Sequence, residues 1–230
     1  MRAKIIGCAI FALSAVFAAS ASNDLQDLMA RMDQAAAKFK AMTAKVHYTT
    51  YVKVIDDTSD ETGTLMMKKM GPSEIAGRID FITPDVRTVV FEKREAQVYQ
   101  PKIKTVTIYD LGKHGEQLDR FLMIGFGTSG TELAQDYAMQ VLGMEEVGGK
   151  QTTRLELIPK VDAIKSYVVK LDLWIPNAPN DPYPTQEKIY QPGGDYRLVN
   201  YSDLKVNPSL PANALELKLP NGVHTERPQK

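Results

Sequence analysis

The segment Gly125–Gly130 has the spacing Gly-x-Gly-x-x-Gly, which is typical of loops that hold the pyrophosphate of a dinucleotide. In a dinucleotide-binding fold this loop joins a strand to a crossover helix, and a second parallel strand ends in an acidic residue that binds the ribose. The surrounding sequence does not show that alternation of strands and helices. Ser129 and Glu132 form the pattern of a capping box, so the glycines are better explained as a flexible lead into a helix.

The other residues that could do chemistry are few. His47, His114 and His224 lack the spacing of a metal-binding helix, and all three are expected on the solvated surface. Neither a Gly-x-Ser-x-Gly nucleophile motif nor a P-loop is present. The sequence therefore predicts a protein that is not an enzyme, with neither a cofactor nor a metal.

A cluster of acidic residues lies between two predicted strands, at Asp56, Asp57, Asp60 and Glu61. Carboxylates can bind calcium, but the spacing of an EF-hand loop is missing. A solvated hairpin tip is the better interpretation.

The first 21 residues have the pattern of a secretory signal peptide. Arg2 and Lys4 form a basic start, residues 5–17 are apolar, and Ala19-Ser20-Ala21 is a small-residue cleavage site. The apolar run is shorter than the roughly 20 residues that a membrane-spanning helix needs. We therefore predict cleavage after Ala21, export to the periplasm, and a single domain formed by residues 22–230.

The composition of the chain argues against some classes of function. The chain has 28 basic and 28 acidic residues, and loss of Arg2 and Lys4 leaves 26 against 28, a net charge of −2. No basic excess is available to neutralise phosphates, which argues against a nucleic-acid partner. The one cysteine, Cys8, lies in the signal peptide, so the mature chain has no disulfide and no thiol nucleophile.

The periodicity of apolar residues indicates an α+β fold. A helix is predicted over 24–42, starting at a capping box formed by Asn23 and Gln26, with further helices at 115–123 and at 131–142, the last stopped by Gly143. Strands are predicted at 46–54, 62–69, 75–81, 86–92, 96–100, 105–110, 151–159, 166–175, 185–190, 196–206 and 215–219. Short turns join most strands, so we expect one long antiparallel sheet that helical segments partly cover.

The order of these elements is more specific than any single motif. It includes a long helix running into a strand, the return strand Gly63–Lys69, and the closing segment with Leu210-Pro211 and Leu215–Val223. This order resembles the LolA-like family of periplasmic outer-membrane lipoprotein carriers. The resemblance implies a curved, unclosed antiparallel sheet, a half-barrel, with helices covering its concave face and an apolar cavity for acyl chains.

The candidate residues for lining that cavity are apolar and have helical or alternating spacing: Met29, Met32, Leu65, Met67, Ile79, Phe81, Val89, Phe91, Leu133, Tyr137, Val169, Leu171 and Leu173. An ordinary packed core, rich in methionine, would show the same pattern. The resemblance also implies an arginine that latches the lid helices, for which Arg78 is the nearest candidate.

The resemblance implies a monomeric carrier that binds acyl chains of lipoproteins or another lipid without covalent chemistry. Such a carrier takes its cargo from an inner-membrane donor and passes it to an outer-membrane acceptor. Three alternatives remain open. They are a periplasmic sensor whose ligand occupancy controls a protein partner, an enzyme that uses Gly125–Gly130 for a nucleotide, and a structural envelope protein with a filled core.

Overall fold

The computed structural model describes residues 14–72, 74–112 and 115–228. Its main element is a single sheet of twelve strands in the order β12-β6-β5-β4-β3-β2-β1-β11-β10-β9-β8-β7. The strands are β1 (Ala41–Val52), β2 (Asp57–Gly71), β3 (Glu74–Thr83), β4 (Arg87–Glu92), β5 (Glu95–Gln100), β6 (Thr105–Asp110), β7 (Tyr137–Val147), β8 (Lys150–Pro159), β9 (Lys170–Pro176), β10 (Gln186–Tyr190), β11 (Tyr196–Val206) and β12 (His224–Glu226).

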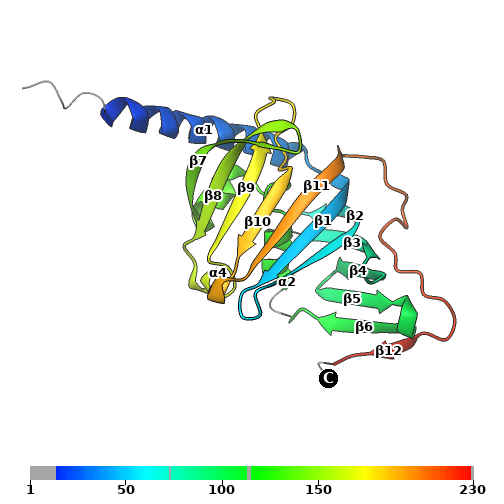
Figure 1. The fold of residues 1–230 in the computed structure, drawn as a ribbon. Helices are drawn as coiled ribbons and strands as arrows, with labels where there is room; N and C mark the ends of the chain where they lie inside the picture. Colours follow the sequence, from blue (N-terminus) through cyan, green and yellow to red (C-terminus); the bar gives the residue numbers. More distant parts are fainter. Residues whose placement is uncertain (1–13, 73, 113–114, 229–230) are drawn as a thin grey trace, which may run out of the picture.

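Neighbouring strands are antiparallel except for the short pair β12–β6. The sheet is curved and does not close into a barrel, since β7 and β12 are its two edges (Figure 1). The predicted α+β class and the unclosed antiparallel sheet are therefore confirmed.

Four α-helices accompany the sheet in the described residues: α1 (Ser14–Lys38), α2 (Gly115–Leu122), α3 (Gly130–Asp136) and α4 (Asp162–Lys165). Behind the strands of Figure 1, α2 and the segment up to α3 lie on the covered face of the sheet. Helix α1 buries Leu28, Met32 and Ala35, which recur every three or four residues and so share one face of the helix, and Phe39 is buried just after its end.

The bounds of the first helix differ from the prediction. Helix α1 begins at Ser14, upstream of the predicted capping box at Asn23, and it ends at Lys38, while β1 already starts at Ala41. Met42 is fully buried and pairs with Met67 of β2, so it belongs to the sheet.

The predicted helix over 131–142 is wrong in its second half. Helix α3 ends at Asp136, and the chain continues as the edge strand β7. Leu133, Tyr137 and Val141 have helical spacing, but Tyr137, Met139 and Val141 equally satisfy the two-residue period of a strand, and the structure places all of them against the core. The predicted helix stop, Gly143, lies at an irregularity in the β7–β8 pairing.

Two other strand predictions also need correction. The segment 215–219 does not form a strand, and the last strand of the chain is β12, which pairs with β6. The predicted strand at 166–175 begins at Lys170, since α4 and a turn precede it.

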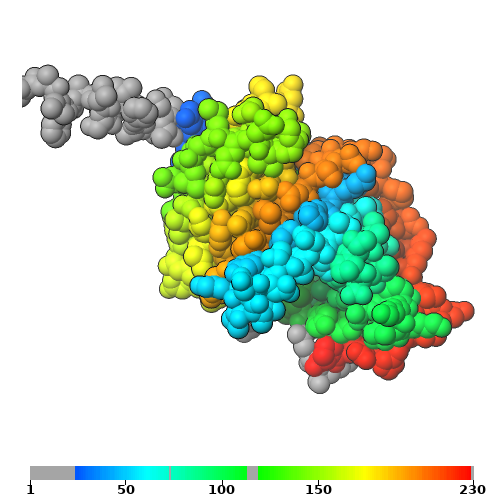
Figure 2. Space-filling model, in the orientation of Figure 1, coloured from blue at the N-terminus to red at the C-terminus, as the bar shows by residue number. Residues whose placement is uncertain are grey.

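Figure 2 shows the outer face of the sheet, where the strands follow one another as bands from β7 in green to β2 in cyan. A network of charged side chains lies on this face. Asp172 of β9 is fully buried and accepts a hydrogen bond from Arg154 at 2.6 Å, and the Arg154 guanidinium also bonds Glu145 at 3.1 Å. The same guanidinium lies 4.9 Å from the ring of Trp174.

Candidate functional site

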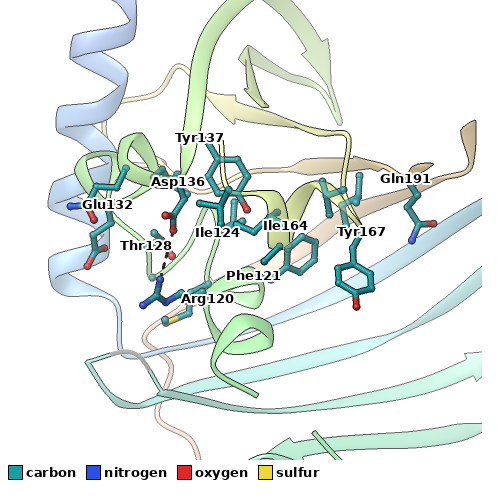
Figure 3. A pocket seen from close by; sticks show the side chains of 18 of the residues that line it. Arg120, Phe121, Ile124, Thr128, Glu132, Asp136, Tyr137, Ile164, Tyr167 and Gln191 are labelled. Carbon is teal, nitrogen blue, oxygen red and sulfur yellow. Dashed lines mark ion pairs between the residues drawn. The ribbon is translucent and has the colours of Figure 1, made fainter. Parts of the chain in front are cut away.

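A groove of about 640 Å³ lies between the covered face of the sheet and the segment formed by α2 and α3 (Figure 3). Its wall contains apolar side chains from six separate parts of the chain: Phe121, Ile124, Leu133, Tyr137, Ile164, Val168 and Ile189. Strand β10 supplies Ile189, the start of β7 supplies Tyr137, and the connection between β8 and β9 supplies Ile164 and Val168. This size and lining are typical of small-molecule sites.

The glycine-rich segment Gly125–Gly130 forms part of the groove wall, with Gly127 and Thr128. Ser129 accepts a hydrogen bond from the amide of Glu132, and the Glu132 carboxylate accepts one from the amide of Ser129, so the predicted capping box of α3 is confirmed. Gly130 allows α3 to approach α1 closely, because a Cβ atom there would lie 2.9 Å from the Cα atom of Met29. Thr131 donates two hydrogen bonds to Asp33, at 3.0 and 2.9 Å, which join α3 to α1.

The same geometry contradicts the dinucleotide-binding alternative. Residues 121–124 precede the glycines as the end of α2 and a turn, and they do not form a strand. Gly125 has a φ of +79° and lies against Pro184, where a Cβ atom would be 2.7 Å from the proline ring. Phe126 is buried against Phe39, Tyr183 and Tyr201, so this loop packs into the core and does not present its amides to a ligand.

Two of the predicted cavity residues, Leu133 and Tyr137, line the groove. Others are buried next to it or beyond it. Met32, Leu171 and Leu173 belong to the core cluster that includes Leu133 and Tyr137, whereas Leu65, Met67, Ile79 and Phe91 belong to a second cluster around Phe126.

The remaining predicted cavity residues lie elsewhere. Met29 is half-buried against Gly130, and Val89 pairs with Ile79 away from the groove. Phe81 is covered by the guanidinium of Arg87, 3.8 Å from the ring centroid. Val169 was predicted to line the cavity, but its side chain is 52% exposed. The preceding residue, Val168, is buried and lines the groove instead.

Arg78 does not latch a helix in this structure. Its guanidinium bonds both carboxylate oxygens of Asp80, at 2.8 and 2.9 Å, and donates to the backbone carbonyl of Glu216 at 2.6 Å. These contacts fasten the C-terminal segment across β3. Helices α2 and α3 and the segment between them, residues 115–136, cover the groove and are called the lid below. The lid is held by the bonds between Thr131 and Asp33 and by an ion pair of 3.8 Å between Arg120 of α2 and Asp136 of α3.

A buried carboxyl group lies on the covered face of β10. Glu187 is 6% exposed and accepts a hydrogen bond from the Tyr201 hydroxyl at 3.1 Å. Burial raises the pKa of Glu187 to about 7. Burial and the nearby Glu187 also raise the pKa of Tyr48 to about 12, and burial and Asp136 raise that of Tyr137 to the same value.

The acidic residues and histidines that were considered for metal binding bond to separate side chains and do not gather into one site. Asp60 bonds Thr49 and His47, Glu61 pairs with Arg87, and Asp56 accepts a bond from Tyr51. His224 lies in β12, and His114 falls outside the described residues. Within residues 14–72, 74–112 and 115–228, no group of three or more His, Cys, Asp or Glu side chains could hold a metal ion.

Apart from Leu133 and Tyr137, the residues that line the groove were missed by sequence reasoning. Ile164, Tyr167, Ile189 and Arg197 line it, yet they come from the β8–β9 connection, β10 and β11. Only the two-residue alternation of β10, which puts Glu187 and Ile189 on one face, could have indicated that Ile189 faces the lid.

No family model matches the sequence, and no curated protein is significantly similar to it. Solved structures match the fold. MucB superposes with a TM-score of 0.53 at 14% identity over 85% of this chain and 63% of its own, so this chain spans less than two thirds of MucB. A conserved protein of Thermus thermophilus has a TM-score of 0.52 at 12% identity, covering 89% of this chain and 99% of that one. LprF of Mycobacterium bovis has a TM-score of 0.50 at 11% identity, covering 85% and 99%.

Lipoprotein-sorting proteins occur among the more distant matches. A LolA superfamily protein of Nitrosomonas europaea and a putative outer membrane lipoprotein-sorting domain of Vibrio parahaemolyticus align over 84% and 86% of this chain, with TM-scores of 0.38 and 0.42. The matches with TM-scores of 0.50 or more, to MucB, the Thermus thermophilus protein and LprF, show that this chain shares their fold. At identities of 11–14% they show the fold alone and assign no ligand to this chain.

Proposed function

We propose that the mature protein binds the acyl chain of a lipoprotein or of another lipid in the groove and carries it through the periplasm. The observation that carries this proposal is the apolar wall formed by Phe121, Ile124, Leu133, Val168 and Ile189 under a short helical lid. Each methylene group buried there contributes roughly 0.8 kcal/mol, so a long chain gains enough free energy to leave water. The role requires no catalytic residue and no cofactor.

Export to the periplasm is part of the proposal. Leu28 is buried and Leu25 partly buried, and both follow Ala21, so cleavage after Ala21 would leave their contacts intact. In Figure 1 the first turns of α1 extend beyond the edge strand β7. Among the helices of the described residues, none is both long and apolar enough to cross a membrane.

A carrier of this kind needs partners at both membranes. The protein would act as a monomer, receive its cargo from an inner-membrane donor and release it to an outer-membrane acceptor. Release requires movement of the lid, and this movement would break the bonds from Thr131 to Asp33 and the ion pair between Arg120 and Asp136.

A second function is favoured by one comparison. The fold of this chain superposes on that of MucB, and MucB has been solved in complex with MucA. The same groove could therefore serve a periplasmic regulator, in which lipid occupancy controls binding to a protein partner. Such a protein would bind lipid but would not deliver it to acceptor vesicles.

A groove-filling substitution tests lipid binding. The chain from residue 22 is titrated with N-phenyl-1-naphthylamine, an uncharged apolar dye whose fluorescence rises on leaving water. We expect Ile189→Trp to weaken dye binding at least tenfold, because the indole occupies the groove, while Ile82→Trp, at a 57% exposed site on β3, leaves it unchanged. Equal dye binding by both variants and the unmodified protein would contradict the proposal.

A further inference from the structure

The two ends of the groove differ in charge. At the end beside α1, Arg120 pairs with Asp136, and Glu132 adds a second carboxylate, so this end carries one net negative charge (Figure 3). At the other end the lining is formed by Tyr167, Gln191 and Arg197. Figure 3 shows Tyr167 and Gln191 together at this end, away from the acidic side chains.

Arg197 lies on the same face of the sheet as the groove. It is directly opposite Ile189 in the β10–β11 ladder. Gln191 lies two residues beyond Ile189, and its backbone amide donates a hydrogen bond to the backbone carbonyl of Asp195. The exposed Arg197 guanidinium forms no ion pair with any residue of the described ranges 14–72, 74–112 and 115–228. The carboxyl of Glu187, on the same face, is bonded to Tyr201 instead.

The polar groups at this end are donors without partners. The structure gives no hydrogen bond for the Gln191 side-chain amide or for the Tyr167 hydroxyl, both of which belong to described residues. A guanidinium, an amide and a phenol at the end of an apolar groove suit a carboxylate or phosphate, which only accepts hydrogen bonds. The acidic far end would repel the same group, so the charges also set the direction in which a ligand lies.

The volume of the groove, about 640 Å³, lies within the range of roughly 300–1,000 Å³ that is typical of sites for a single small molecule. The groove therefore has room for one long acyl chain with the lid in place.

We propose that the groove binds a single-chain anionic amphiphile, with its carboxylate or phosphate at Arg197 and its chain running towards Arg120. This inference rests on the proposed function, since it requires that the apolar wall hold an acyl chain. Glu132 and Asp136 would exclude the reversed orientation.

Competition for bound N-phenyl-1-naphthylamine tests the proposal with three probes of equal chain length: hexadecanol, palmitate and hexadecyl phosphate. For the unmodified protein we expect an anionic probe to bind at least tenfold more tightly than hexadecanol, because charge-assisted hydrogen bonds to a guanidinium are strong. Palmitate alone gaining this advantage would identify a fatty acid, and hexadecyl phosphate alone would identify a phosphate headgroup.

Two matched variants complete the test. Arg197→Gln should reduce the affinity for the anionic probes to that for hexadecanol while leaving hexadecanol unchanged, and Arg227→Gln, at a surface site that does not line the groove, should not reduce the affinity for the anions. If hexadecanol binds as tightly as both anions, or if Arg197→Gln binds the anions normally, the headgroup assignment is wrong and chain binding stands. If none of the three probes displaces the dye, the proposed function itself fails.

Discussion

The hydroxyl of Tyr201 donates a hydrogen bond of 3.1 Å to the carboxyl of Glu187 on the covered face of the sheet, where both side chains are surrounded by the core. The partner of this buried carboxyl group, the Tyr201 hydroxyl, is uncharged. Burial therefore dominates, and it raises the pKa of Glu187 to about 7.

This raised pKa makes stability fall as the pH rises. The folded protein keeps a proton that the unfolded chain releases at its ordinary pKa near 4.5, so the free energy of unfolding declines between about pH 4.5 and pH 7 and then levels off. The shift corresponds to about 3 kcal/mol. Urea titrations at pH 5 and pH 8 should show that Glu187→Gln gains most of this amount relative to the unmodified protein at pH 8. The exposed control Glu146→Gln should show no such pH dependence, and a parallel response of both variants would refute the assignment.

The contact between α3 and α1 predicts that Gly130 tolerates no side chain. A Cβ atom there would meet the backbone of Met29 at 2.9 Å, so Gly130→Ala should destabilise the protein by about 1–3 kcal/mol and loosen the lid. Gly71→Ala is the control, because its Cβ atom would lie 3.5 Å from a flexible side chain. Thermal unfolding of the two variants decides the point, and equal melting temperatures would show that α3 does not pack as described.

The bond from Arg78 to Glu216 predicts that the C-terminal segment loosens when the guanidinium is removed. In Arg78→Ala, trypsin should cleave at Lys218 faster than in the unmodified protein, because the carbonyl of Glu216 loses its donor. Lys93→Ala, at an exposed site, should leave the cleavage rate unchanged. Dye binding should be unaffected in Arg78→Ala; a loss of dye binding with normal cleavage would restore the lid-latch interpretation.

The network on the outer face predicts a large effect at one aspartate. Asp172 is fully buried and pairs with Arg154, so Asp172→Ala leaves the guanidinium short of a partner and should cost about 3 kcal/mol of unfolding free energy. Asp162→Ala removes a carboxylate that is 96% exposed and should have no measurable effect. Urea unfolding at neutral pH measures both, and similar midpoints would show that the buried pair contributes little.

The sequence predicted the sheet well because its signals are local. The alternation of Val46 with its neighbours and the polar residues that follow predict a hairpin without any distant contact. The turn itself lies at residues 53–56, earlier than the predicted tip, and Asp57, Asp60 and Glu61 already belong to β2. The stretch 137–141 satisfied both a helical and a strand period, and only its pairing with β8 decided between them.

The site was less predictable because it is assembled from distant segments. Leu133 and Tyr137 follow a recognisable capping box, but Ile189 and Arg197 reach the groove only through the order of strands in the sheet. The partner of Arg78 lies 138 residues away in a segment without regular structure, so no local pattern could identify it.

The most direct test of lipid binding is the mass of the protein as it leaves the cell. The mature chain should be purified from a periplasmic extract without detergent, and its native mass compared with its denatured mass. We predict a native mass that exceeds the denatured mass by one acyl-chain lipid, and the loss of this adduct in Ile189→Trp. Identical native and denatured masses, repeated after incubation with palmitate, hexadecyl phosphate and hexadecanol, would contradict the account.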